Sequence, residues 1–132
     1  MTISFDQIQL VNAKVNLFPY EFHISELWKH MQSDMPRGAC SNYATTKYDI
    51  LVLEGWPTSA LRLACCYVEP FKWPDGRDAT LNERYHAVLL VDFEGQTWVL
   101  DNRRAYPTEY KLLPYTWDKL QVAGTDKWEK PA

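Results

Sequence analysis

Three side chains in the sequence have the types and the order needed for nucleophilic catalysis by a thiol. Cys40 is followed by His86 and then by Asp101. In such a set the thiolate attacks a carbonyl carbon, the imidazole takes up and returns a proton, and the carboxylate orients the imidazole and stabilises its charged form. Each residue alone has an ordinary structural explanation, as a buried cysteine, a strand histidine or a turn aspartate. The three together favour a cysteine hydrolase.

The residues around Cys40 predict that it lies in the first turn of a helix. Segment 39–53 contains neither Pro nor Gly, and its apolar residues recur at helical spacing along one face. Gly55 and Pro57 follow, and they mark the end of this helix. The first turn of a helix carries partial positive charge, which lowers the pKa of a thiol. It also leaves the N–H of Cys40 free to donate to an oxyanion.

His86 and Asp101 are predicted to lie on the two arms of one β-hairpin. Two strand-like runs, 85–93 and 96–101, are separated by Glu94-Gly95, which is a good signal for a two-residue turn. A turn of that length places His86 and Asp101 on the same face of the sheet, diagonally offset by two positions. A turn of odd length would place them on opposite faces. The hairpin therefore permits a hydrogen bond between the two side chains.

Other segments supply the elements around this hairpin. Short helices are predicted over 6–16 and 25–31, a buried strand over 60–68, and a further strand over 110–115. The long segment 69–84 is rich in Pro, Gly, Asp and Asn, and loops of this length are commonly functional or mobile. Helices followed by three or four antiparallel strands predict an α+β fold, with a central helix packed on the sheet.

Composition indicates one compact domain without a nucleic-acid or membrane role. The chain has 132 residues, of which 46% are hydrophobic, so we expect a single domain over residues 1–132. The formal net charge is −3 and no basic run occurs, which argues against nucleic acid as a partner. No apolar run is long enough for a membrane span, and the first residues lack the pattern of a secretory signal. A cytoplasmic setting is expected.

The cysteines and histidines do not predict a disulfide framework or a metal centre. Of the three cysteines, Cys65 and Cys66 are adjacent, and an odd total leaves at least one thiol unpaired. No Cys-x-x-Cys occurs, and the three histidines lie outside any familiar zinc spacing. We expect no cofactor and no metal ligands.

Several short motifs occur together over nearly the whole chain. They are Val11-Asn12, Val15-Asn16, Gly38-Ala39-Cys40-Ser41-Asn42-Tyr43-Ala44, Lys47, Gly55-Trp56-Pro57, Leu61-Arg62-Leu63, His86-Ala87-Val88-Leu89 and Leu100-Asp101-Asn102. In order, spacing and context they resemble the bacterial transglutaminase-like cysteine proteinases. The resemblance extends from Val11 to about Trp128.

The resemblance implies a papain-like, or transglutaminase-like, fold and a role for each residue of the set. Cys40 would be the nucleophile, His86 the general base and then acid, and Asp101 the residue that holds the imidazole. An amide or peptide bond in a protein or peptide substrate would be cleaved through a thioester. Trp28 resembles an upstream tryptophan of the family whose indole N–H could be the second oxyanion donor, although a core tryptophan is the more common explanation.

Two departures from the family pattern concern calcium and the long loop. In adhesin-cleaving members, acidic residues around the cysteine help to bind calcium, whereas this chain has Ala39, Ser41 and Asn42. Because carboxylates supply most of the affinity for calcium, we expect calcium to be an unlikely partner. Segment 69–84 is longer than in the family and carries aromatic residues. It either borders the cleft and alters substrate choice, or is a tolerated surface insertion.

Two other functions fit the same residues. A transglutaminase or deamidase acting on glutamine side chains would form the same thioester, and the sequence does not say whether water or an amine then attacks it. A non-catalytic binding module could keep the fold and use its aromatic surface. A binding module has no need for Cys40, His86 and Asp101 together, so the hydrolase is preferred. The resemblance also favours a bacterial or phage origin.

Overall fold

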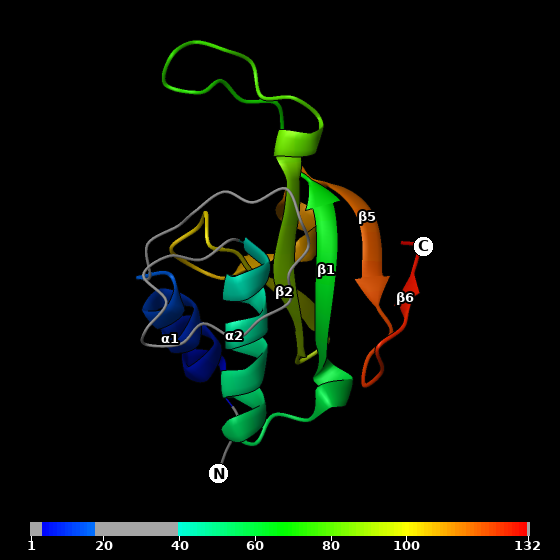
Figure 1. Cartoon of the computed structure of the whole chain (residues 1–132). Helices are drawn as coiled ribbons and strands as arrows, with labels where there is room; N and C mark the ends of the chain where they lie inside the picture. The colour runs from blue at the N-terminus through cyan, green and yellow to red at the C-terminus, as the bar shows by residue number, and fades with distance from the viewer. Residues whose placement is uncertain (1–3, 18–39, 132) are drawn as a thin grey trace.

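The computed structural model describes residues 4–17 and 40–131. In these residues two α-helices precede six strands (Figure 1). The elements are α1 (Phe5–Val15), α2 (Cys40–Leu53), β1 (Leu61–Tyr67), β2 (Tyr85–Phe93), β3 (Gln96–Leu100), β4 (Thr108–Glu109), β5 (Thr116–Gln121) and β6 (Trp128–Glu129). The predicted helices over 6–16 and 39–53 are thus confirmed within one residue at their described ends. The predicted helix over 25–31 lies outside the described residues.

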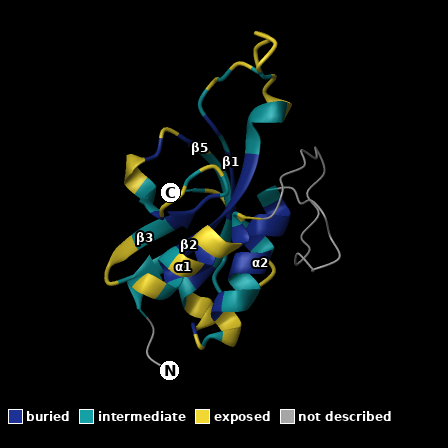
Figure 2. Cartoon of the chain, turned by 90° about the vertical axis from the view of Figure 1, so that its left-hand side faces the viewer, coloured by how far each residue is buried: buried dark blue, intermediate teal, exposed yellow. Residues whose placement is uncertain are grey.

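The strands form one antiparallel sheet in the order β4-β3-β2-β1-β5-β6. Both helices lie on the same side of this sheet, with α2 running along β2 (Figures 1 and 2). The predicted α+β fold, with the helix that begins at Cys40 packed on an antiparallel sheet, is confirmed. In the described part of the chain, no helix is long and apolar enough to cross a membrane.

Helix α2 ends as its sequence predicts. Gly55 adopts a φ of 100°, the left-handed region that a residue with a Cβ rarely enters. The N–H of Gly55 donates to the carbonyl of Val52 at 3.1 Å, and the N–H of Trp56 donates to the carbonyl of Leu51 at 3.0 Å. These two bonds form a Schellman motif, which satisfies carbonyls that the end of a helix would leave unpaired. The turn sends the chain back toward the sheet.

The β2–β3 hairpin has the predicted two-residue turn. Glu94 and Gly95 have φ values of 51° and 79°, the pair of positive angles that a type I′ turn requires. Phe93 therefore pairs with Gln96, and the same register continues to the end of β3. The predicted strand over 96–101 ends one residue early, so that Asp101 begins the turn that follows β3. The register places the side chain of Asp101 on the same face of the sheet as that of His86, at the start of β2, as expected.

The C-terminal part of the sheet differs from the prediction. The strand expected over 110–115 is wrong, because Tyr110–Leu112 forms a short 3₁₀-helix between β4 and β5. The sequence patterns do not predict strands β5 and β6. The residues of β5 are mostly half-buried and mix charged with apolar side chains, so their alternation is weak. Their pairing with β1 and with each other, rather than local preference, defines these strands.

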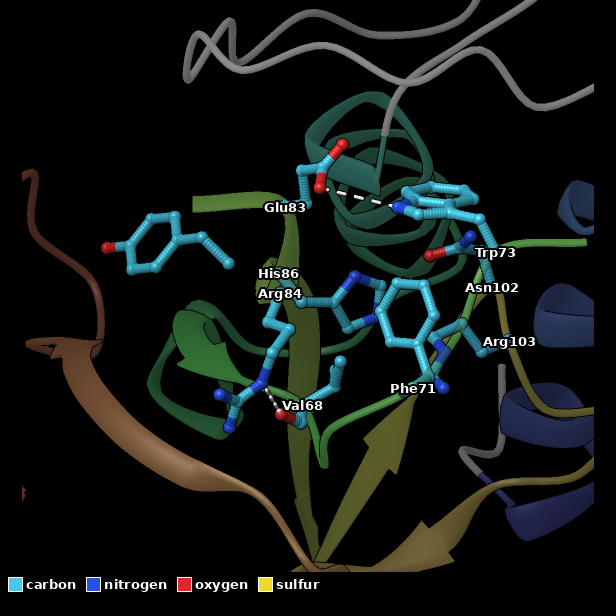
Figure 3. Close-up of a pocket in the computed structure, with 9 residues that line it drawn as sticks. Val68, Phe71, Trp73, Glu83, Arg84, His86, Asn102 and Arg103 are labelled. Atoms are coloured by element: carbon cyan, nitrogen blue, oxygen red, sulfur yellow. Dashed lines mark hydrogen bonds between the residues drawn. The ribbon is translucent and has the colours of Figure 1, made fainter. Parts of the chain in front are cut away.

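Segment 69–84 is a long loop between β1 and β2, and it projects beyond one end of the sheet (Figure 1). Its tip is exposed (Figure 2). The two arms are joined by one isolated bridge, Lys72 to Asp78, and by the N–H of Ala79 donating to the carbonyl of Phe71 at 2.9 Å. The base of the loop brings side chains next to the first residues of β2, where they line a pocket (Figure 3).

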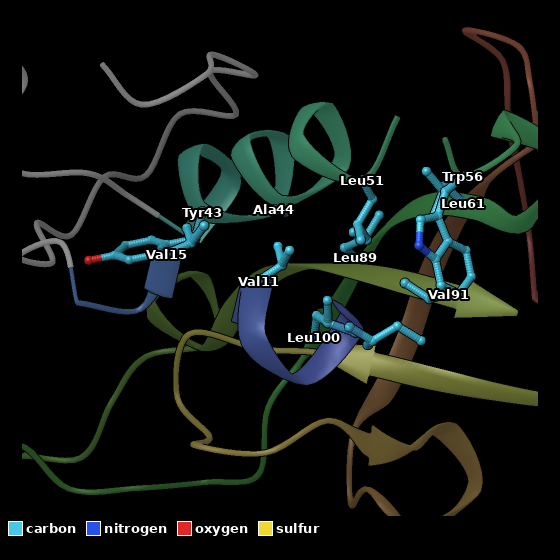
Figure 4. Close-up of a cluster of buried hydrophobic side chains, with 11 residues drawn as sticks. Val11, Val15, Tyr43, Ala44, Leu51, Trp56, Leu61, Leu89, Val91 and Leu100 are labelled. Carbon is cyan, nitrogen blue, oxygen red and sulfur yellow. The ribbon is translucent and has the colours of Figure 1, made fainter. Parts of the chain in front are cut away.

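One apolar cluster fixes both helices to the sheet (Figure 4). Its fully buried members come from α1, α2, the turn after α2, and strands β1 to β3. They are Ile8, Val11, Val15, Tyr43, Ala44, Leu51, Trp56, Leu61, Leu89, Val91 and Leu100. A second cluster covers the opposite face of the sheet and includes Val88, Leu90 and Tyr115. The sheet is therefore buried on both faces, and the elements at its centre are held rigidly.

The hairpin turn supplies the first testable prediction. Replacing Gly95 by Ala is expected to lower the free energy of unfolding by about 1 kcal/mol, because an L side chain is disfavoured at positive φ. No atom lies within 4 Å of the added Cβ, so the effect is conformational rather than steric. Glu94→Asn is expected to act in the opposite direction, since Asn enters the left-handed region more readily than Glu. Urea unfolding measures both, and equal midpoints for the two variants would contradict the assigned turn.

Candidate active site

The thiol of Cys40 lies at the start of α2 and contacts the beginning of β2. Its Sγ accepts a hydrogen bond from the backbone N–H of Ala87 at 3.3 Å. It also interacts with the imidazole of His86 and with the N–H of Ser41. Since α2 is fixed to the sheet by the apolar cluster, the thiol is held against β2 by two rigid elements.

The imidazole of His86 connects the thiol to a buried carboxylate. Its Nε2 lies 2.7 Å from Oδ1 of Asp101. The side chain of His86 is buried, and that of Asp101 is fully buried. Because Nε2 is engaged by the carboxylate, Nδ1 is the ring nitrogen left to face the sulfur of Cys40. The three side chains therefore form one continuous chain of contacts, as the order of the sequence predicted.

Both oxygens of Asp101 are satisfied by donors from the protein. The N–H of Arg103 donates to Oδ1 at 2.8 Å, in a tight turn immediately after β3. The hydroxyl of Tyr115 donates a short hydrogen bond to Oδ2. Desolvation is costly for a carboxylate unless such donors replace water, and here three donors do so. These bonds let Asp101 remain ionised inside the fold.

A bulge in β5 directs Tyr115 toward the carboxylate. Cys65 pairs with Lys119, but the next residue of β1, Cys66, pairs with Trp117, so Asp118 is the extra residue of β5. An extra residue reverses which side chains point to a given face. As a result Trp117 and Tyr115 face the same apolar cluster as Leu120.

Cys40, His86 and Asp101 shift one another's pKa values. Burial alone would raise the pKa of Cys40, but the hydrogen bond and positive charge of His86, with the N–H groups of Ala87 and Ser41, hold this pKa below its usual value. Burial would lower the pKa of His86, but the negative charge of Asp101 and its hydrogen bond raise it to about 9. For Asp101, burial is outweighed by the bonds to His86, Tyr115 and Arg103, and its pKa lies well below the usual range. These shifts act in the direction of a thiolate paired with an imidazolium.

Helix α1 holds the turn that carries Asp101. The side-chain amide of Asn16 donates to the carbonyls of Asp101 and Arg104, at 3.0 and 3.1 Å. One helical turn earlier, Asn12 donates to the carbonyls of Arg104 and Ala105, at 3.1 and 3.4 Å. The two Val-Asn pairs of α1 thus have a structural explanation. Their valines belong to the apolar cluster, and their asparagines fix the turn after β3.

A fully buried lysine completes this polar layer. The Nζ of Lys47, from α2, donates to Oδ1 of Asn12 at 2.8 Å. Burial lowers the pKa of Lys47 to about 7, and the negative charge of Asp101 opposes part of that shift. Lys47 therefore links α2 to α1, and through Asn12 to the turn of Asp101.

The structure describes three of the four predicted site residues. Cys40, His86 and Asp101 are brought together, whereas Trp28 lies outside the described residues. The sequence did not identify Tyr115 and Lys47 as members of the site. The direction of the Tyr115 side chain depends on the bulge in β5, and no local sequence pattern predicts that bulge. Lys47 had a detectable signal, because it shares a helical face with buried apolar residues, where an unpaired lysine is costly.

Comparison with known families gives a match over nearly the whole chain. A family model described as bacterial transglutaminase-like cysteine proteinase matches residues 2–130. Comparison with curated protein sequences gives no match.

Three solved structures of one protein share the fold. Calcium-bound LapG from Legionella pneumophila has a TM-score of 0.74 and 22% identity, over 95% of this chain and 67% of that chain. EGTA-treated LapG has a TM-score of 0.68 and 23% identity, over 95% of this chain and 70% of that one. A further LapG structure has a TM-score of 0.68 and 23% identity, over 92% of this chain and 69% of that chain.

The expectation that calcium is an unlikely partner is wrong. A protein of the same fold, LapG, is calcium-bound in its solved structure. The expectation used only Ala39, Ser41 and Asn42. Over residues 4–17 and 40–131, no three His, Cys, Asp or Glu side chains are grouped so that they could hold a metal ion.

Replacing Tyr115 by Phe tests the contribution of its hydroxyl to Asp101. We expect a loss of about 1–3 kcal/mol in the free energy of unfolding at neutral pH, because a buried carboxylate oxygen loses its donor. The low pKa of Asp101 gives stability that is present above the unfolded value of 3.8 and is lost as the pH falls. The difference between variant and wild type should therefore shrink in acid.

The matched control for this variant is Tyr85→Phe. Tyr85 donates to Asp118 at 2.7 Å in a partly exposed setting, so water can replace its hydroxyl and the loss should be smaller. Urea unfolding as a function of pH measures both variants. Equal losses at every pH would show that the hydroxyl of Tyr115 does not stabilise an ionised Asp101.

Replacing Lys47 by Met tests the buried ammonium. Between pH 7 and 10.5 the unfolded chain binds a proton at Lys47 that the folded chain does not, so wild-type stability gains from rising pH at this residue. The variant lacks this gain. The stability of Lys47→Met relative to wild type should therefore be highest below pH 7 and decline toward pH 10.5. Unfolding curves at pH 7 and at pH 10.5 measure this difference in stability. Lys72→Met, at an exposed lysine, is the control variant. A pH-independent difference would contradict the depressed pKa.

Proposed function

Because the chain belongs to the family of bacterial transglutaminase-like cysteine proteinases, we propose that it cleaves a peptide or amide bond of a protein substrate through Cys40, His86 and Asp101. The observation that supports this assignment most is the buried 2.7 Å contact between His86 and Asp101, with the imidazole also in contact with the thiol. A binding module would have no use for this costly burial of ionisable groups.

In the proposed reaction the thiolate of Cys40 attacks the carbonyl carbon of the scissile bond. The tetrahedral intermediate collapses when the imidazolium of His86 gives its proton to the leaving amine, and a thioester with Cys40 remains. Neutral His86 then takes a proton from water, which attacks the thioester and releases the carboxylic acid. The thiolate and the imidazolium are restored together, so the charges balance at the end of the cycle.

Asp101 would act by holding the imidazole rather than by taking its proton. Its very low pKa keeps it ionised throughout the cycle, and its bond to Nε2 keeps Nδ1 directed toward the sulfur. The N–H of Cys40, at the start of α2, is the proposed donor to the oxyanion. A role for the indole of Trp28 as a second donor stays a prediction from the sequence.

The pH dependence of alkylation tests the proposed nucleophile. Iodoacetamide should modify Cys40 well below pH 8.5, the ordinary thiol value. Cys65 and Cys66 are internal controls, since both are fully buried and burial with the nearby Asp101 raises the pKa of Cys66. His86→Ala should move the reaction of Cys40 to higher pH. Peptide mapping by mass spectrometry locates the modified residue, and equal inertness of the three thiols in the wild type would refute the assignment.

Cleavage of a peptide mixture tests the proposed reaction itself. We expect the wild type to produce new peptide ends by addition of water, and Cys40→Ala to produce none. Asp101→Asn should keep substrate binding but lower the turnover by about 10⁴-fold, the effect of the same change in a comparable triad. Product masses separate hydrolysis from transfer to an added amine. Activity that survives in Cys40→Ala would exclude the thioester route.

A further inference from the structure

A pocket of about 340 Å³ opens beside His86 (Figure 3). It lies between the base of loop 69–84, the start of β2 and the turn after β3. Besides His86, its lining includes Phe71, Trp73, Glu83, Arg84, Asn102 and Arg103. Since one imidazole borders the pocket and contacts Cys40, a group in the pocket would lie close to the reacting atoms.

The wall that the loop contributes is aromatic and held in place. The rings of Phe71 and Trp73 meet edge to face, with centroids 5.1 Å apart. The guanidinium of Arg77 lies over the indole of Trp73 at 5.7 Å, and the guanidinium of Arg103 lies over Phe71 at 5.9 Å. These contacts preorganise the pocket, which lowers the cost of receiving a ligand.

The charged side chains of the pocket already have partners. Glu83 accepts bonds from Arg77 at 2.9 Å and from the indole of Trp73 at 3.3 Å. Arg103 donates to Glu69 at 2.9 Å, and the Nε of Arg84 donates to the carbonyl of Val68 at 2.9 Å. A charged ligand group at Glu83 or Arg103 would have to compete with these ion pairs, whereas an apolar group would leave them intact. The pocket therefore favours an apolar occupant.

One polar atom at the pocket lacks a partner. The side-chain oxygen of Asn102 is buried without a hydrogen bond. Such a group is costly unless a donor reaches it. This oxygen has no accessible surface, although the residue as a whole is only half-buried, so a peptide N–H can donate to it only after the side chain of Asn102 turns toward the pocket. Asn102 directly follows Asp101, which places the unpaired amide beside the proposed catalytic set.

We propose that this pocket is a substrate subsite for a bulky apolar side chain, aromatic or leucine-like, adjacent to the bond that is cleaved. The inference rests on the proposed function of Cys40. It assigns specificity to loop 69–84, with Phe71 and Trp73 as the residues that select the substrate. Burial of a large side chain against two aromatic rings supplies the binding energy.

Two alkylating reagents test the subsite without a known substrate. Iodoacetamide is compared with N-phenethyl-iodoacetamide, and each rate at Cys40 is divided by the rate of the same reagent with N-acetylcysteine. The phenethyl reagent should react faster than iodoacetamide by roughly tenfold in the wild type, as expected for burial of an apolar group in a pocket, and its rate should saturate with concentration. Phe71→Ala should bring the normalised ratio close to unity, and Phe71→Leu should retain part of the preference.

The matched control is Leu81→Ala. Leu81 belongs to the same loop and is 58% exposed, outside the pocket, so its removal should leave the ratio unchanged. Equal normalised rates in the wild type would overturn the subsite while leaving the reactivity of Cys40, and hence the proposed function, intact. A preference that survives in Phe71→Ala would also overturn it. If Cys40 reacted with neither reagent, the proposed function would fail and the subsite with it.

Discussion

The buried hydrogen bond between His86 and Asp101 is the constraint on which the rest of the structure depends. A carboxylate and an imidazole that leave water lose strong hydration, and the fold must replace it with fixed donors and charges. Asp101 receives these donors from the turn after β3 and from Tyr115 just before β5, while Asn16 next to α1 holds its backbone. Elements from both faces of the sheet therefore converge on one side chain.

The same constraint explains the polar residues inside an otherwise apolar layer. Asn12 and Lys47 lie among the side chains that fix the two helices to the sheet, yet neither contacts Cys40 or His86 through a described bond. They hold the turn of Asp101 through carbonyl groups and through each other. Their hydrogen bonds fix the turn that carries the carboxylate, and the carboxylate in turn raises the pKa of the imidazole. The charge of the imidazole in turn acts to lower the pKa of the thiol at the start of α2.

Local sequence patterns predicted the parts of the molecule that local physics determines. The type I′ turn at Glu94 and Gly95 sets the register of β2 and β3, so the shared face of His86 and Asp101 follows from the residue types and spacing alone. The end of α2 at Gly55 followed from the same kind of reasoning. The prediction of a strand over 110–115 was wrong because the apolar residues of this segment lie in a 3₁₀-helix and in the apolar cluster on the face of the sheet opposite the helices. Tyr115 was missed because a bulge, defined only by pairing with β1, determines where it points.

The ultraviolet absorbance of the thiolate, followed with pH, tests the central claim most directly. The difference between wild type and Cys40→Ser isolates the signal of Cys40, and the same difference is recorded in the Asp101→Asn background. Our account predicts a thiolate that persists well below the ordinary thiol pKa of about 8.5 and that is displaced to higher pH when Asp101 is neutralised. A thiolate that forms only above that pH, or that ignores the change at Asp101, would contradict it.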